Sequence, residues 1–200
     1  MPMTALILAS TSPTRLAMVA AAGLETKAVA PPVDEDVIKR RLRAERASPE
    51  RVAAALAEAK ALAVSDQHPH GLVIGADQML VCDGVCFDKP ADRVAARDQL
   101  QSLRGRTHQL ISAVAVASGG QSQWRTVATA TMTMRPLTDG FLDRYLDRIG
   151  PAAFSSVGAY QLEGLGAQLF DRIEGDHFTI LGLPLLPLLA YLRSQGAADD

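Results

Sequence analysis

Residues 73–78, which read Val-Ile-Gly-Ala-Asp-Gln, place the strongest constraint on how this chain folds. The apolar run 72–74 is typical of a buried strand. Gly75 and Ala76 follow it, and such small residues let a ligand or another backbone come close. In an α/β domain, an Asp that ends a buried strand points into the usual ligand crevice, so Asp77 is a candidate site residue. The alternative is a turn that starts with Asp, a common residue in turns.

Strand-like and helix-like segments alternate along the chain. Residues 5–9 are apolar on both faces and are expected to form a central strand. Asp83 and Gly84 between apolar runs predict a hairpin. The other expected strands cover 27–30, 72–74, 79–82, 85–87, 110–117, 124–134 and 168–173. The expected helices cover 13–23, 49–64, 93–103, 139–149 and 183–193, with one more that carries the basic run 39–46 on a solvated face.

The composition limits the classes of partner. The 200 residues fit a single domain, 1–200, without repeats or an obvious linker. A net charge of −2 and an aromatic content of 4% predict no general affinity for nucleic acid or a membrane surface. The longest apolar stretch, 180–192, is too short to span a bilayer. Two cysteines without nearby histidines favour free thiols in a reducing compartment, and with no signal peptide visible we expect a cytoplasmic protein.

The turn after the first strand has the features of an anion site. Ser10 begins a hydroxyl-rich segment, and Ser12 and Pro13 are a good cap and first residue for the helix that follows. Backbone N–H groups at a helix start bind anions, and Arg15, one turn in, could hold a phosphate with two hydrogen bonds. The alternative is a capped helix with an exposed arginine.

Acidic and lysine residues further along could complete a site for phosphate chemistry. The acids 34–36 precede a helix, where they could interact with its dipole or bind a divalent cation. Lys60 lies near the end of a helix, where lysine is usually a dipole partner. The hairpin brings Lys89 back toward Asp77. Because lysine is seldom buried unless paired, we expect Lys60 and Lys89 to contact phosphates or the attacking water rather than to stabilise the fold.

Together these candidates combine cationic donors with carboxylates, which is what phosphoryl chemistry requires. A P-loop is excluded because no glycine-rich loop ends in Lys-Ser or Lys-Thr, and Gly-x-Ser-x-Gly is absent too. The candidate residues are Ser10, Arg15, Glu35, Lys60, Asp77, Lys89 and Glu163.

The sequence resembles the Maf family of nucleoside triphosphate pyrophosphatases, also called septum-formation inhibitor-like proteins. Its matching segments occur in the order and spacing that are typical of that family. The resemblance covers nearly the whole chain. The matching segments are 6–13 with Arg15, 33–35, 57–61, 74–78, 88–90, 105–108, 158–160 and 182–185.

The resemblance implies an α/β fold similar to that of the inosine triphosphate pyrophosphatases: a long mixed β-sheet flanked by helices, with two lobes around a central cleft. It implies hydrolysis of a nucleotide to its monophosphate and pyrophosphate, with Mg²⁺ or Mn²⁺, in the cytoplasm and often as a homodimer. By motif match, Asp77 is the proton acceptor. The family's phosphate and metal residues match Ser10, Arg15, Glu35, Lys60 and Lys89, with Glu35 and Asp77 as the metal ligands.

Three positions depart from the family's usual pattern, and two of them bear on the branch. Thr14 replaces the first of two basic residues that often follow Ser-Pro. Gln78 stands where the pyrimidine-nucleotide branch has Thr, and Glu163 stands where it has Gln. Gln78 and Glu163 resemble the 7-methyl-GTP branch and are expected to bind substrate, although Glu163 could also be a solvated loop acid. The alternatives are a pyrophosphatase for dTTP or UTP and a non-catalytic, nucleotide-binding regulator of cell division.

Overall fold

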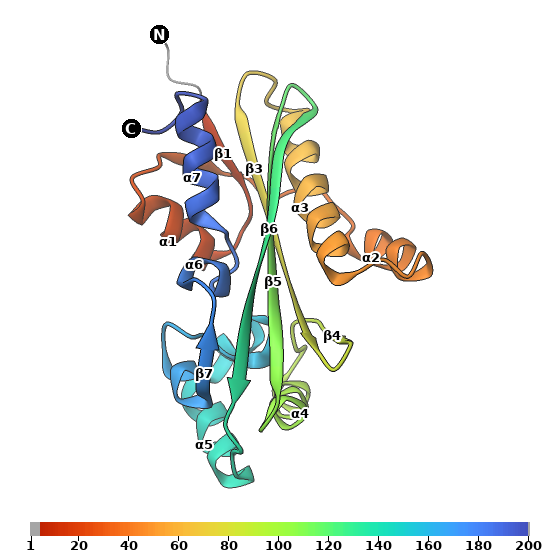
Figure 1. The fold of residues 1–200 in the computed structure, drawn as a ribbon, viewed down its shortest axis with the longest axis vertical. Helices are drawn as coiled ribbons and strands as arrows, with labels where there is room; N and C mark the ends of the chain where they lie inside the picture. The colour runs from red at the N-terminus through yellow and green to blue at the C-terminus, as the bar shows by residue number, and fades with distance from the viewer. Residues whose placement is uncertain (1–4, 200) are drawn as a thin grey trace. The chain divides into compact units, whose positions relative to one another are not determined.

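The structure is a computed structural model that describes residues 5–199. A mixed sheet of seven strands is flanked by helices (Figure 1), which confirms the predicted α/β class. The elements are β1 (Leu6–Ala9), α1 (Pro13–Ala21), β2 (Thr26–Ala28), α2 (Glu35–Ala44), α3 (Pro49–Ser65), β3 (Leu72–Cys82), β4 (Val85–Phe87), α4 (Arg93–Leu103), β5 (Thr107–Ser118), β6 (Gln121–Met134), α5 (Asp139–Ile149), η1 (Gly150–Phe154), η2 (Val157–Ala159), η3 (Leu165–Leu169), β7 (Phe170–Glu174), α6 (His177–Ile180) and α7 (Leu185–Ser194).

The strand order is β2-β1-β3-β5-β6-β7, and β4 pairs with β3 beside this path. β1 is parallel to both β2 and β3, whereas β4 is antiparallel to β3 and β7 is antiparallel to β6. The helix starts follow the predicted capping residues. The side chains of Ser12, Asp92 and Thr138 accept a backbone N–H at the start of α1, α4 and α5.

β3 departs from the prediction. Two short strands were expected, one ending before Asp77 and one starting at Met79, but β3 is a single strand of 11 residues. β5 is its neighbour in the sheet, β1 pairs with it as far as Ala9 with Gly75, and β4 pairs with its last three residues. Asp77 therefore does not end its strand. It lies just past the point where the parallel neighbour β1 ends.

Contacts divide the chain into two compact units, each assembled from separate stretches. β3, β5 and β6 each contribute residues to both units. The first unit contains residues 5–78, 111–128 and 182–199, and the second contains 79–110 and 129–181.

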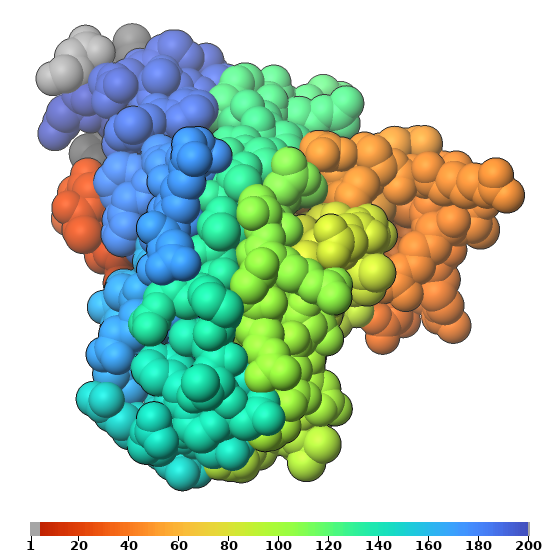
Figure 2. All heavy atoms as spheres, turned by 60° about the horizontal axis from the view of Figure 1, so that its bottom comes forward, coloured from red at the N-terminus to blue at the C-terminus, as the bar shows by residue number. Residues whose placement is uncertain are grey.

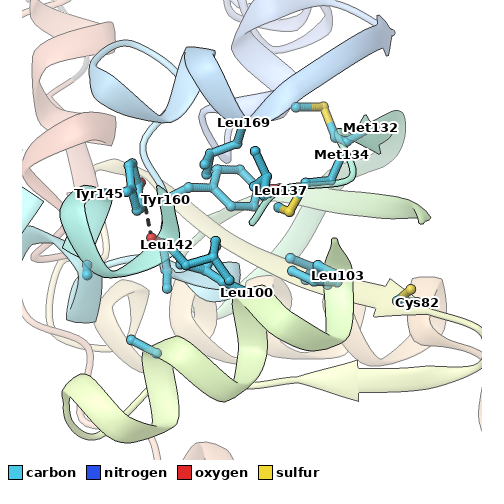
Figure 3. Close-up of a cluster of buried hydrophobic side chains, with 14 of the residues drawn as sticks. Cys82, Leu100, Leu103, Met132, Met134, Leu137, Leu142, Tyr145, Tyr160 and Leu169 are labelled. Carbon is cyan, nitrogen blue, oxygen red and sulfur yellow. Dashed lines mark hydrogen bonds between the residues drawn. The ribbon is translucent and has the colours of Figure 1, made fainter. Parts of the chain in front are cut away.

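The second unit has an apolar core that encloses one histidine. Figure 3 shows side chains from β6, α4 and α5 that point toward one another around Tyr160. His108 is 1% exposed, and its Nε2 lies 2.8 Å from the hydroxyl of Tyr160. Burial lowers the pKa of His108 to about 4, so the imidazole is neutral at pH 7.

On the surface of the second unit, α4 and α5 lie side by side, in yellow-green and teal in Figure 2, and exchange ion pairs. Arg97 donates to Asp143 at 2.8 Å, and Arg104 donates to Asp139 at 2.6 Å. Such solvated pairs contribute little to stability. No helix within residues 5–199 has the length and apolar character needed to cross a bilayer.

In the first unit, α3 packs against β3 with almost no space between the two backbones. A Cβ atom added to Gly75 would lie 2.2 Å from the carbonyl oxygen of Ala57 and 2.6 Å from the amide nitrogen of Ala61. Both of these alanines are fully buried on α3. The glycine is therefore required by contact with the helix.

We predict that Gly75→Ala lowers the free energy of unfolding by about 1–3 kcal/mol or more, because the added methyl group must push α3 away from β3. Urea unfolding followed by circular dichroism measures the change. Gly140→Ala is the control, since a Cβ in α5 would meet only the mobile end of Arg144, and its helix propensity should raise stability by up to about 1 kcal/mol. Equal stability of Gly75→Ala and the parent would contradict the proposed packing.

Candidate active site

A lysine held between two carboxylates forms the centre of the candidate site. Nζ of Lys60 lies 2.7 Å from Oδ1 of Asp77 and 2.8 Å from Oε1 of Glu35. Lys60 and Asp77 are each 7% exposed, whereas the side chain of Glu35 is 41% exposed. The contact between Lys60 on α3 and Asp77 on β3 is therefore largely buried, and the contact with Glu35 reaches the surface.

The local structure distinguishes between the alternative roles that the sequence left open for Lys60 and for the acids 34–36. Lys60 was open to a role at the helix end, but α3 continues to Ser65 and the ammonium group is paired inside the unit. Burial and pairing with Asp77 favour a structural contribution of Lys60, contrary to the expectation that it does not stabilise the fold, and its role in stability stays a prediction. Of the three acids, Asp34 caps α2 through the backbone N–H of Val37, and Glu35 is the one that reaches Lys60.

Arg15 is not an exposed arginine, which excludes that alternative. It is half-buried in the first turn of α1, and its Nε and Nη1 donate to the carbonyl oxygens of Gly182 at 2.8 Å and Ala76 at 3.0 Å. Burial lowers the pKa of Arg15, and the charges of Asp77 and Glu35 partly offset that effect.

Two polar groups of this cluster stay open for a ligand. Within residues 5–199, one side-chain nitrogen or oxygen is fully buried without a hydrogen-bond partner, and it is Nδ1 of His108. Nη2 of Arg15 and Oδ2 of Asp77 have no partner in that part of the chain either, so both reach solvent. One donor and one acceptor are thus available beside a fixed ion pair.

Ser10 lies where the sequence predicts, at the end of β1. Its Oγ accepts the backbone N–H of Ser12 at 3.1 Å, and Ser12 in turn caps α1 through the N–H of Arg15. Because Ala9 pairs with Gly75, the start of this turn lies beside the part of β3 that leads to Asp77. The predicted hydroxyl-rich turn at a helix start is confirmed, and its binding of phosphate stays a prediction.

Ser112 and Gly182 contact predicted site residues, and the sequence did not single out either of them for such a role. Nε2 of Gln78 donates to the hydroxyl of Ser112 at 3.0 Å, and Ser112 is fully buried in β5. A single serine inside an apolar strand carries no signal of function. Gly182 was part of a matched motif, but nothing in the sequence indicates that its carbonyl oxygen holds Arg15.

Lys89 and Glu163 belong to the second unit, whereas the first unit contains Ser10, Arg15, Glu35, Lys60, Asp77 and Gln78. Lys89 follows β4, whose pairing of Phe87 with Leu80 confirms the predicted hairpin. Glu163 is exposed in the turn before η3. The roles of both residues stay predictions.

The two carboxylates could hold a divalent cation in one specific way. Residues 5–199 contain no group of three His, Cys, Asp or Glu side chains arranged around a metal ion. In enzymes that act on phosphates, Mg²⁺ is held by one or two carboxylates together with substrate phosphates rather than by an all-protein cage. Glu35 and Asp77 fit that donor set.

Comparison with known proteins assigns the chain to a family. Residues 5–195 match the family described as Maf-like protein. The chain belongs to that family. This match confirms the resemblance inferred from the motifs.

Close relatives match over nearly their whole length. A Maf-like relative from Paramagnetospirillum magneticum, named nucleoside triphosphate pyrophosphatase, is 54% identical over 95% of this chain and 98% of its own. Relatives from Brucella abortus and Rhizobium meliloti, both named 7-methyl-GTP pyrophosphatase, are 52% and 53% identical over 97% of this chain and 98% of their own. A solved dITP/XTP pyrophosphatase from Mycobacterium abscessus is similar at a TM-score of 0.40, with 15% identity over 96% of this chain and 95% of that chain.

We predict that Lys60→Met lowers the free energy of unfolding by about 3–5 kcal/mol, because it leaves the buried Asp77 carboxylate without its partner. Denaturant unfolding measures the loss. Glu35→Gln should change stability by less than about 1 kcal/mol, since that contact is partly exposed.

A double variant separates loss of the charge pair from loss of packing. Lys60→Met with Asp77→Asn removes both charges and should recover most of the stability that Lys60→Met alone loses. Equal destabilisation of the single and double variants would mean that packing of the lysine side chain, and not its charge, is responsible.

Proposed function

We propose that this chain is a nucleoside triphosphate pyrophosphatase that releases a nucleoside monophosphate and pyrophosphate. The observation that carries the proposal is the arrangement of Asp77: Lys60 fixes one carboxylate oxygen, and the other oxygen reaches solvent near Arg15. That geometry suits a group that accepts a proton from water beside a bound phosphate. The names of the full-length relatives support the same reaction.

In the proposed reaction, Oδ2 of Asp77 accepts a proton from a water molecule as that water attacks the α-phosphorus. The bond between the α-phosphorus and the oxygen that bridges to the β-phosphate breaks, and pyrophosphate leaves with the bonding electrons. Arg15, through Nη2, is placed to donate to a phosphate oxygen where negative charge accumulates. Lys60 holds the carboxylate in position, and Lys89 is proposed to donate to the departing phosphates.

The charge balance of the site supports a metal cofactor. Arg15 and Lys60 are matched by the carboxylates of Glu35 and Asp77, so these four residues together carry no net charge. A triphosphate brings several negative charges to this cluster and needs further positive charge. Mg²⁺ or Mn²⁺, held by Glu35 and Asp77, would supply that charge and polarise the phosphoryl oxygens.

We propose 7-methyl-GTP as the preferred nucleotide, with Glu163 as the residue that recognises its base. Guanine offers two adjacent N–H donors, and a carboxylate accepts both, while N7-methylation adds positive charge that favours the carboxylate further. Uracil and thymine offer one N–H between two carbonyl groups. A carboxylate facing those carbonyls would be unsatisfied, at a cost of about 1–3 kcal/mol per group.

A regulator that binds nucleotides without turnover is the competing class of function. Binding alone does not require an open carboxylate oxygen beside an arginine, so the arrangement of Asp77 favours an enzyme. Pyrophosphate release from a panel of nucleotides, with Mg²⁺ or Mn²⁺ and with a chelator, distinguishes the two classes. We expect release that the chelator abolishes, and binding of nucleotides without release would refute the proposal.

We predict that Asp77→Asn lowers kcat by about 10²–10⁴-fold, since asparagine keeps the shape of the side chain but cannot accept the proton. Single-turnover measurements of pyrophosphate release test this, with circular dichroism to show that the variant is folded. Asp36→Asn, in the exposed first turn of α2, is the matched control and should retain the parent rate. An active Asp77→Asn variant would rule out Asp77 as the base.

We predict that the parent hydrolyses 7-methyl-GTP faster than GTP, UTP or dTTP, and that Glu163→Gln loses most of this preference because an amide cannot accept two donors. The comparison uses kcat/KM for all four nucleotides with both proteins. If the parent prefers UTP or dTTP, the chain instead belongs with the pyrimidine-specific enzymes and Glu163 is a solvated loop acid.

A further inference from the structure

Gly182 lies against two of the predicted substrate-binding side chains at once. Its carbonyl oxygen accepts a hydrogen bond from Nε of Arg15 at 2.8 Å. A Cβ at this position would lie 3.3 Å from Nη2 of Arg15 and 3.5 Å from Oε1 of Gln78. The backbone has a φ of +94°, which side chains other than glycine rarely adopt. The glycine thus leaves room for both neighbours and supplies the acceptor for one of them.

Ser112 holds Gln78 from the opposite end of its amide group. Its fully buried hydroxyl accepts Nε2 of Gln78 at 3.0 Å. Because the nitrogen end of the amide faces Ser112, the oxygen end faces Gly182. The serine therefore fixes which end of the amide lies on the same side as Arg15.

We propose that Ser112 and Gly182 are positioning residues that set the orientation of Gln78 and Arg15 before the nucleotide binds. The proposal rests on the proposed function, in which those two side chains contact substrate. Ser112 acts through the amide of Gln78, and Gly182 acts through the guanidinium group of Arg15. Both groups are then held in a single orientation without the nucleotide.

The expected benefit is a lower cost of binding. A flexible glutamine or arginine loses side-chain freedom when it meets a ligand, whereas one already held by the protein loses little. Loss of the contact that holds Gln78 should therefore appear mainly in KM, because it weakens binding of substrate and transition state alike. A residue that only stabilises the fold would change the unfolding free energy without this selective effect on KM.

The kinetic test compares two substitutions of Ser112. Ser112→Ala removes the acceptor and should raise KM for 7-methyl-GTP by about five- to tenfold, with kcat within about twofold of the parent. Ser112→Thr keeps the hydroxyl but adds a methyl group at a fully buried position, so it should be less stable and yet keep the parent KM. If KM follows stability rather than the hydroxyl group, Ser112 is merely structural.

Ser65 supplies a matched control in the same unit. It is also fully buried, and its hydroxyl accepts the backbone N–H of Gly120 at 3.1 Å. Ser65→Ala loses a comparable hydrogen bond without contact to Arg15 or Gln78. It should lower stability and leave KM unchanged, and a rise in KM equal to that of Ser112→Ala would overturn the proposal.

A second pair of variants tests the glycine. Gly182→Ala should lower kcat/KM by about 10- to 100-fold, because the methyl group displaces the Arg15 side chain. Gly23→Ala imposes similar backbone strain, at a φ of +77° with nothing within 4 Å of the added Cβ, and should keep the parent kinetics. Equal kinetic losses in both variants would show that strain alone is responsible.

A readout without turnover separates this proposal from the proposed function. The side-chain N–H signals of Gln78 and Arg15 can be followed by NMR in the nucleotide-free protein. Ser112→Ala should shift the Gln78 amide signals and speed their exchange with water. Gly182→Ala should have the same two effects on the Nε–H signal of Arg15. The control variants Ser65→Ala and Gly23→Ala should leave both sets of signals unchanged. Unchanged signals would overturn the positioning roles even if the parent hydrolyses nucleotides. Shifted signals in a protein that hydrolyses none would support the positioning and refute the enzyme.

Discussion

The ion pair between Lys60 and Asp77 is the contact on which the candidate site depends. It joins α3 to β3 across a distance of 2.7 Å. Two residues before Asp77, Gly75 lets the backbone of α3 approach β3 more closely than any side chain would permit. The absence of a side chain at Gly75 thus allows the charged contact of Asp77, two residues further along β3.

In the proposed function, the same charged groups serve stability and chemistry. Lys60 gives the buried Asp77 carboxylate a partner of opposite charge, and it also orients the carboxylate oxygen that stays open to solvent. A lysine that contacted only the substrate would lie in solvent until the substrate arrived. Here the ammonium group is held in advance, so the site is pre-organised at the expense of tying its integrity to that of the fold.

Much of this arrangement could be predicted from the sequence, and the remainder follows from contacts that no local pattern encodes. Ser12 and the Asp83–Gly84 turn were predictable because caps and hairpins depend on neighbouring residues. The single long strand through Asp77 was not, since Gly75 and Ala76 resemble a strand end and only the neighbouring β5 shows otherwise. The motifs singled out Lys60, but not its burial, and Ser112 is visible only once β5 lies beside β3.

The contact between Arg15 and Gly182 joins residues that are 167 positions apart in the chain. At a synthesis rate of roughly 5–20 residues per second, an interval of about 10–30 s separates their emergence during translation. Throughout that interval the arginine at the start of α1 lacks the carbonyl partner that holds it. The newly made N-terminal segment therefore cannot bind nucleotide as the finished protein does, and any competence of this site begins only after Gly182 has been made.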